Sequence, residues 1–130
     1  MLLSLYQPAY KVQAAHLLLC IIWNLIGVIQ ISLGYQSIGP TASLLLIVIL
    51  VLTWSGMWTS LNRGFQRSYC ALSLLAVTSA FFAVYSAVTL TADNWPSEFW
   101  RYAGIAVNSV GAAGFILLIR QSFIKTKNRN

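Results

Sequence analysis

The sequence contains few charged residues and very few acidic ones. Charged residues make up 8% of its 130 positions, and only Asp93 and Glu98 are acids. Because a soluble domain carries about 25% charged residues, this composition predicts an integral membrane protein. The two carboxylates have no accompanying nucleophile or metal ligands, so the sequence also argues against an enzyme.

Cysteine and histidine are equally scarce. Cys20 and Cys70 form no CxxC pattern and His16 is the one histidine, so the spacing predicts no metal site. Both cysteines fall in or beside the half of the membrane that charge counting assigns to the cytoplasm, where a structural disulfide is disfavoured. The start of the chain is not typical of a cleaved signal, because no basic residue precedes Lys11 and the apolar run is too long. We therefore expect no disulfide, no metal and no cofactor.

Apolar residues are abundant, at 58% of the chain. Four apolar runs approach the roughly 20 residues that cross about 30 Å of hydrocarbon. They predict spans at about residues 12–33, 42–61, 69–92 and 102–119. The predicted fold class is all-α, a four-helix transmembrane bundle that makes one transmembrane domain of residues 1–130.

The two ends of the chain are expected to lie outside these spans. Pro8 disfavours a continuous helix from the start, so residues 1–10 are predicted to be an interfacial segment. Tyr6 and Tyr10 would then lie at the level of the lipid headgroups. Residues 120–130 are predicted to be a basic, frayed cytoplasmic tail.

Basic residues gather on one side of the predicted topology. With four spans, the N-terminus, the middle loop and the tail share a side, which holds seven of the eight basic residues: Lys11, Arg63, Arg67, Arg120, Lys125, Lys127 and Arg129. The other side holds Arg101 and both acids. The positive-inside rule then predicts cytoplasmic termini in a multi-pass protein of the cell inner membrane. Since topology explains these charges, the net charge of +6 does not indicate nucleic-acid binding.

One stripe of the first predicted span is polar or small rather than aliphatic. Alternating steps of three and four residues place its members on one helix face: Gln13, His16, Cys20, Trp23, Gly27, Gln30 and Gly34. We call this stripe the polar seam. Lipid cannot satisfy its polar groups, so we expect the other spans to gather around it.

His16 has two interpretations. It could be an axial haem ligand, as in small membrane anchors of respiratory enzymes, with a second histidine supplied by another chain. It could instead be an interhelical polar residue held by hydrogen bonds, and this interpretation is favoured.

Further polar residues of the spans fall in the outer half of the membrane: Asn24, Gln30, Tyr85, Ser86, Asn108 and Ser109. They could line a cavity for a small ligand or a conduction path, but interhelical hydrogen bonds are the favoured interpretation. We expect Gln30 and Asn108 to pair, because each amide would be costly to leave alone in hydrocarbon. No span has a charged residue in its core, which argues against coupled transport.

Small residues recur at helical spacing in several spans and predict close helix packing. The candidate packing positions are Gly27, Ser79, Ala83, Ala87, Gly104 and Gly111.

The last outer loop is a candidate contact site at the periplasmic face, formed by Asp93, Trp95, Glu98, Trp100 and Arg101. A structural role is favoured here as well. Glu98 and Arg101 have the i,i+3 spacing of an ordinary helical ion pair, and the tryptophans suit membrane anchors.

These observations predict a non-enzymatic accessory or anchoring subunit of a larger membrane assembly. Its expected partners are the lipid bilayer and either further copies of itself or a larger membrane protein. The alternatives are a self-associating channel or pore, holin-like proteins included, and a haem-carrying anchor of a redox complex.

Overall fold

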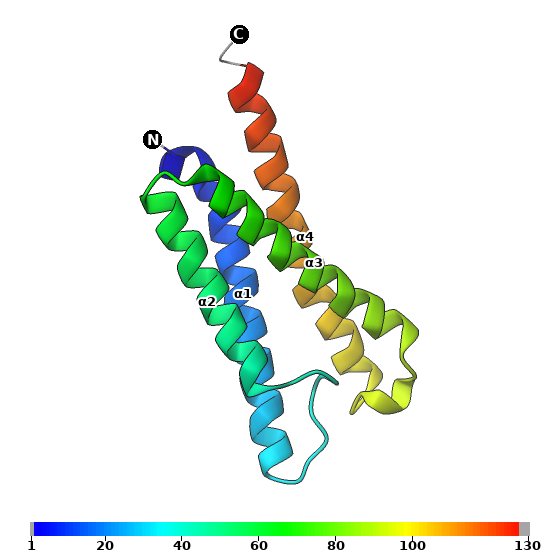
Figure 1. Ribbon diagram of the computed structural model, residues 1–130. Coiled ribbons are helices and arrows are strands. Elements are labelled where there is room, and N and C mark those ends of the chain that lie inside the picture. The colour runs from blue at the N-terminus through cyan, green and yellow to red at the C-terminus, as the bar shows by residue number, and fades with distance from the viewer. Residues whose placement is uncertain (1, 128–130) are drawn as a thin grey trace.

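The structure is a computed structural model that describes the backbone of residues 2–127 and the side chains of residues 5–124. It consists of α1 (Leu2–Ser32), α2 (Leu44–Asn62), α3 (Gln66–Thr89), a short 3₁₀ turn η1 (Ala92–Asn94) and α4 (Glu98–Lys127) (Figure 1). No strand occurs in this part of the chain. All four α-helices are long and apolar enough to cross a membrane, so the all-α prediction with four candidate spans is confirmed.

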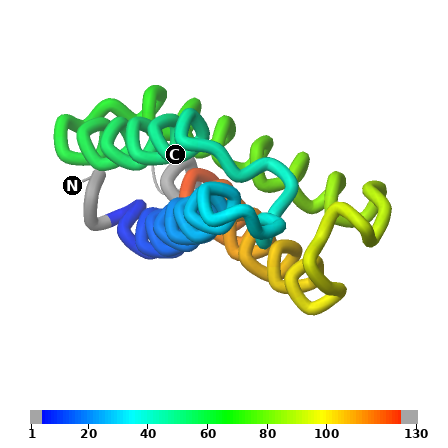
Figure 2. Tube along the Cα trace, turned by 90° about the horizontal axis from the view of Figure 1, so that it is seen from below, coloured from blue at the N-terminus to red at the C-terminus, as the bar shows by residue number. Residues whose placement is uncertain are grey.

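The helices form a bundle in which sequence neighbours are also spatial neighbours. α1 packs against α2 and α4, and α3 packs against the same two helices. The start of α1, the α2–α3 turn and the end of α4 lie together at one end (Figure 1), and we call this part of the bundle the terminal half. The opposite part, which contains the α1–α2 loop and η1, is called the loop half. Seen from below, the α1–α2 loop reaches across this half toward η1 (Figure 2).

Glycine ends two of the helices. Gly34 and Gly64 have φ angles of 80° and 77°, the left-handed conformation that a Cβ makes costly. The next amides then bond back into the helix, with Tyr35 N donating to Gln30 O at 2.9 Å and Phe65 N to Ser60 O at 2.7 Å. Both ends are thus Schellman motifs, which turn the chain sharply into the next segment.

The start of α1 differs from the sequence-based expectation. α1 is helical from Leu2 and contains Pro8, so the expectation that Pro8 prevents a continuous helix is wrong. Tyr6 is fully buried within the bundle, with its ring 5.8 Å from that of Tyr69. One proline removes a single hydrogen bond near the helix start, and the burial of Tyr6 and Ala9 offsets that loss.

The end of α4 also differs from the expectation. α4 starts at Glu98 and continues to Lys127, beyond the predicted span of 102–119. The frayed tail predicted from residue 120 is therefore wrong for 120–127, while residues 128–130 lie outside the described part. Leu118 is 3% exposed, and Ser122 Oγ lies 3.4 Å from Tyr6 OH. The two helix extensions thus pack against each other, which is why both persist.

The terminal half contains the densest packing. Its buried residues come from all four helices and form one cluster: Tyr6, Ala9, Leu17, Met57, Leu61, Tyr69 and Leu118. The loop half instead surrounds a cavity.

Candidate functional site

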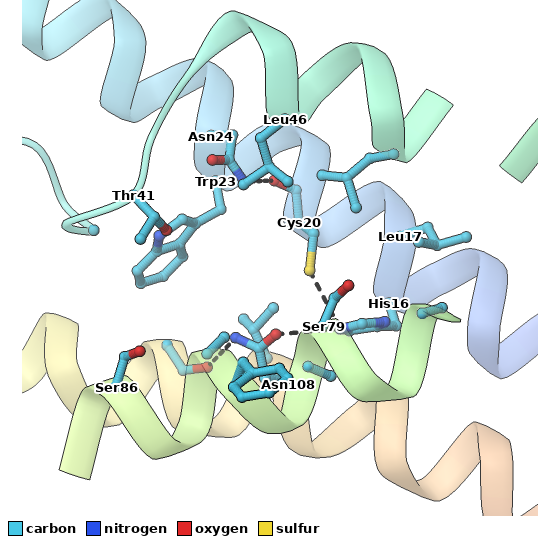
Figure 3. A pocket seen from close by; sticks show the side chains of 18 of the residues that line it. His16, Leu17, Cys20, Trp23, Asn24, Thr41, Leu46, Ser79, Ser86 and Asn108 are labelled. Atoms are coloured by element: carbon cyan, nitrogen blue, oxygen red, sulfur yellow. Dashed lines mark hydrogen bonds between the residues drawn. The ribbon is translucent and has the colours of Figure 1, made fainter. Parts of the chain in front are cut away.

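A cavity of about 390 Å³ lies among the four helices in the loop half. Side chains of the polar seam form one wall and Asn108 of α4 stands opposite (Figure 3). No Asp, Glu, Lys or Arg is among the residues that line it. Its volume falls within the range of about 300–1,000 Å³ that small-molecule sites occupy.

The polar seam positions the histidine of this cavity. His16 and Cys20 are one turn apart on α1, with Cys20 Sγ 3.2 Å from His16 Nε2. The same nitrogen is 3.5 Å from Asn108 Oδ1, at the outer limit of a hydrogen bond. Asn24 Nδ2 donates to Cys20 O at 2.8 Å, and Asn108 Nδ2 donates to Gly104 O at 2.8 Å. His16 and Asn108 therefore join the first helix to the last.

Gly111 explains how the imidazole fits between α1 and α4. A Cβ at this glycine would lie 2.6 Å from His16 Cε1 and 2.7 Å from His16 Nδ1. The ring is thus pressed against the α4 backbone through a site that only glycine leaves open. An axial haem ligand needs a ring nitrogen that faces the iron, whereas Nδ1 faces α4 and Nε2 faces Cys20 and Asn108. The geometry suits the interhelical role better than the haem role.

Cys20, His16 and Asn108 also resemble, in residue types, the catalytic set of cysteine proteases. In such a set the nucleophile and the orienting residue bond to opposite nitrogens of the imidazole. Here both approach the same nitrogen, Nε2. The arrangement therefore lacks the relay geometry of a nucleophilic triad.

The buried side chains of His16, Leu17 and Thr53 close the cavity toward the terminal half, and a tyrosine and a serine from α3 bond to the polar seam beyond them. Tyr69 OH donates to Gln13 Oε1 at 2.6 Å, and Ser73 Oγ donates to the same oxygen at 3.3 Å. The sequence identified Gln13 but not its partners. Tyr69 and Ser73 begin the buried stripe of α3, which continues at alternating steps with Ala76, Ala80, Ala83 and Ala87. The same three-and-four spacing that identified the polar seam could have found them.

The α1–α2 loop closes the other end. Ile38 is 1% exposed and its N donates to Gln30 Oε1 at 2.8 Å. Gln36 Nε2 donates to Asp93 O at 2.9 Å, so the loop is tied both to α1 and to the α3–α4 connection. Trp95, which is 8% exposed, completes this end of the cavity.

The predicted pair of Gln30 and Asn108 is not formed, since Gln30 bonds to the loop and Asn108 to His16 and Gly104. The expected depths assumed that α4 starts at residue 102. Because it starts at Glu98, Asn108 lies about 15 Å from the helix start, while Gln30 is two residues from the end of α1.

The remaining polar candidates differ in their placement. Ser86 lines the cavity, whereas Tyr85 is 57% exposed on the outer surface of α3. Ser109 also lies exposed and donates to Ile105 O at 2.8 Å within its own helix.

The small residues are placed unevenly. A Cβ at Gly27 would lie 2.5 Å from Ala42 Cβ, and one at Gly104 would lie 3.3 Å from the Trp95 ring, so both permit close approach. Ala87 is 1% exposed. Ala83 is half-buried beside the cavity, while Ser79 is exposed at its edge and donates to Leu75 O.

The predicted periplasmic contact residues interact mainly with one another and with the bundle. Arg101 Nε donates to Ala87 O at 2.7 Å near the end of α3, and its Nη1 is 3.1 Å from Glu98 Oε1. The Trp100 ring lies 5.8 Å from Trp23 and 5.2 Å from Phe99. The Asp93 side chain is exposed.

The arrangement as a whole is an uncharged cavity that is closed at both ends of the bundle and has its polar wall on α1 and α4. Such a site can hold a neutral molecule by hydrogen bonds and ring contacts. Comparisons with protein-family models, with curated protein sequences and with solved structures found no match to this chain.

Proposed function

We propose that this chain is a non-enzymatic accessory or anchoring subunit of a larger assembly in the cell inner membrane. The observation that supports this proposal is an apolar stripe on the projecting end of α4. The stripe consists of Ile116, Ile119 and Phe123, which share one helix face and are 64%, 41% and 72% exposed.

Contact with lipid explains the exposed apolar side chain of Ile116, at the start of this stripe, but not that of Phe123, at its end. α4 has 30 residues and is about 45 Å long, whereas the hydrocarbon core is about 30 Å thick. Phe123 follows Arg120, whose guanidinium belongs in the headgroup region. α4 also projects past the α2–α3 turn (Figure 1). An apolar face that continues beyond the hydrocarbon is typical of a contact with protein, and the occupant we propose is an apolar helix of a partner subunit.

The proposed orientation has both termini in the cytoplasm. The start of α1, the α2–α3 turn and the end of α4 lie at one end of the bundle (Figure 1), and among the described residues these segments carry Lys11, Arg63, Arg67 and Arg120. The opposite end has Arg101, whose charge is paired with Glu98. The positive-inside rule supports this assignment.

Cysteine labelling tests the orientation. Ser68 and Ser97 are exposed at opposite ends of the bundle and differ from cysteine by one atom. In a background with Cys20→Ser and Cys70→Ser, we expect an impermeant maleimide added to intact cells to label Ser97→Cys and to spare Ser68→Cys. Labelling at position 68 alone would reverse the proposed topology.

Site-specific photocrosslinking tests the partner. A benzoylphenylalanine at position 123 should form one discrete adduct with a different membrane protein, and Phe123→Ser should abolish stoichiometric co-purification of that protein. The matched control is Leu52, 65% exposed in the middle of α2, where lipid is the expected neighbour. The accessory role is rejected if position 123 forms no discrete adduct, or the same adducts as position 52.

The alternative of a self-associating pore predicts a different adduct. The terminal half of one copy is filled by the buried cluster around Tyr69 and Met57, so a pore would have to form between copies. An adduct at position 123 with twice the mass of the chain would favour this alternative over the accessory role.

A further inference from the structure

The cavity in the loop half opens sideways between α2 and α3. These helices touch where Gly56 faces Leu72, since a Cβ on the glycine would lie 2.9 Å from Leu72 Cδ1. Toward the loop half α3 diverges from α2 (Figure 1). Ile49 and Phe82 both line the cavity and are also 44% and 62% exposed on the outer surface. The opening thus lies between apolar side chains at the depth of two apolar helices, where a membrane supplies lipid rather than water.

Along the bundle the cavity is closed toward the terminal half by the buried side chains of His16, Leu17 and Thr53, and at the other end by the α1–α2 loop with Trp95. A molecule that enters between α2 and α3 must therefore dissolve in the bilayer. The apolar edge of the opening suits an aliphatic tail, which would lie along Ile49 and Phe82.

The wall opposite the opening suits a different chemical group. Asn24 and Asn108 each donate one amide hydrogen to their own helix and retain a second one. On the helices that border the opening, Thr53 of α2 and Ser79 of α3 donate their hydroxyl hydrogens to Ile49 O and Leu75 O, which leaves their oxygens as acceptors. The cavity thus offers donors and acceptors for carbonyl or hydroxyl groups.

Charge and size restrict the ligand further. A phosphate or carboxylate needs a cationic partner in such a site, and the residues that line the cavity include no Lys or Arg. The volume of about 390 Å³ holds a compact head but not a long tail. The Trp23 indole, which extends over the cavity in Figure 3, offers a flat surface to a ring.

We propose that this cavity binds the head of a neutral, membrane-soluble molecule that carries carbonyl or hydroxyl groups, with its apolar tail extending between α2 and α3. Two sources share this chemistry, a substituted quinone and a diacylglycerol. This binding site is additional to the proposed accessory role and does not depend on the surface around Phe123.

Native mass spectrometry of the purified full chain tests the proposal. The probes are a decyl-substituted benzoquinone, dioctanoylglycerol and dioctanoyl phosphatidic acid. We expect a saturable one-to-one adduct with at least one of the two neutral probes and much weaker binding of the phosphatidic acid. A quinone adduct alone would identify ring recognition, and a glyceride adduct alone would identify the hydroxyl head.

Two variants localise the binding. Ala83→Phe places a ring in the cavity and should weaken binding by about tenfold or more. The matched control is Ala106→Phe, at an exposed position of α4 outside the cavity, which should bind as the parent does. Helicity and melting of both variants confirm that they fold. If Ala83→Phe does not fold, Ser86→Leu, also at the cavity, replaces it in the same comparison.

Three results would overturn the proposal. The first is the absence of a saturable adduct with either neutral probe. The second is equal binding by the parent and the folded cavity variant. The third is binding of phosphatidic acid as tightly as the neutral probes, because the cavity would then not select neutral molecules over anions.

Discussion

The two halves of the bundle use similar residues for different purposes. In the terminal half, Tyr69 and Gln13 meet within a cluster of buried side chains. In the loop half, Asn24 and Asn108 have similar polarity but border a cavity. The difference arises from helix direction, because α3 touches α2 at Gly56 and then diverges from it. Polar residues in a membrane bundle thus become packing contacts or cavity walls according to helix separation, and residue type alone does not decide between them.

The largest effect is expected in the terminal half. Tyr69→Ala removes a fully buried ring and leaves Gln13 without its 2.6 Å hydrogen bond. We expect a loss of about 3–5 kcal/mol in the free energy of unfolding. Tyr85→Ala on the same helix, where the ring is 57% exposed, should cost much less. Unfolding in detergent followed by circular dichroism compares them, and equal losses would show that the terminal half is not the packed one.

Leucine substitutions at two small residues compare the close contact of α1 with α4 and the space of the cavity. Gly111→Leu must displace His16, whose ring lies against this glycine, and should destabilise by about 1–3 kcal/mol. Ala83→Leu extends into the cavity and should change stability by less than about 1 kcal/mol. Thermal melting of the two variants measures the difference. If Ala83→Leu lowered the melting temperature more than Gly111→Leu, the space beside Ala83 would have to be occupied by other side chains.

A smaller effect is expected for the contact between His16 of α1 and Asn108 of α4. A double-mutant cycle with His16→Leu and Asn108→Leu should give a coupling free energy of about 0.6–1.7 kcal/mol, as for other interhelical hydrogen bonds in membranes. The same cycle with Gln30→Leu in place of His16→Leu should be additive, because Gln30 bonds to Ile38 instead. Coupling of Gln30 but not of His16 to Asn108 would restore the pairing expected from sequence.

The smallest effect is expected at the outer surface of the loop half. Glu98→Gln removes an exposed ion pair with Arg101 and should cost no more than about 0.5 kcal/mol. Arg101→Met also removes the 2.7 Å bond to Ala87 O and should cost about 1 kcal/mol. Equal effects of the two variants in an unfolding titration would show that the bond to α3 contributes nothing.

Sequence reasoning predicted the helices better than their ends. Apolar run length identified four helices, and α2 and α3 begin and end within three residues of their predicted limits. Pro8 and Arg120 were both interpreted as helix limits, because local rules treat a proline and a charge near the interface as stops. Neither ends a helix here, since Tyr6 and Ser122 join the two extensions and this contact is separated by 116 positions in the sequence.

The sequence predicted which face of α1 points into the bundle but not which side chains form hydrogen bonds with each other. The spacing of the polar seam placed Gln13 and His16 on one face, and both are buried. Their partners depend on the relative heights of helices, which a shift of one turn changes. The four residues by which α4 begins before its predicted start correspond to about 6 Å, whereas Gln30 and His16 are about 21 Å apart along α1, so α4 also starts at a different height relative to the end of α1.

The contact between His16 and Asn108 has a consequence for biosynthesis. α1 leaves the ribosome before α4, so α1 enters the membrane before Asn108 is available to His16. The ring of helices closes only after synthesis of α4. A chain that stops after α3 would leave the side of His16 that α4 covers open to lipid, a polar surface by which membrane proteases would distinguish it from a chain that includes α4.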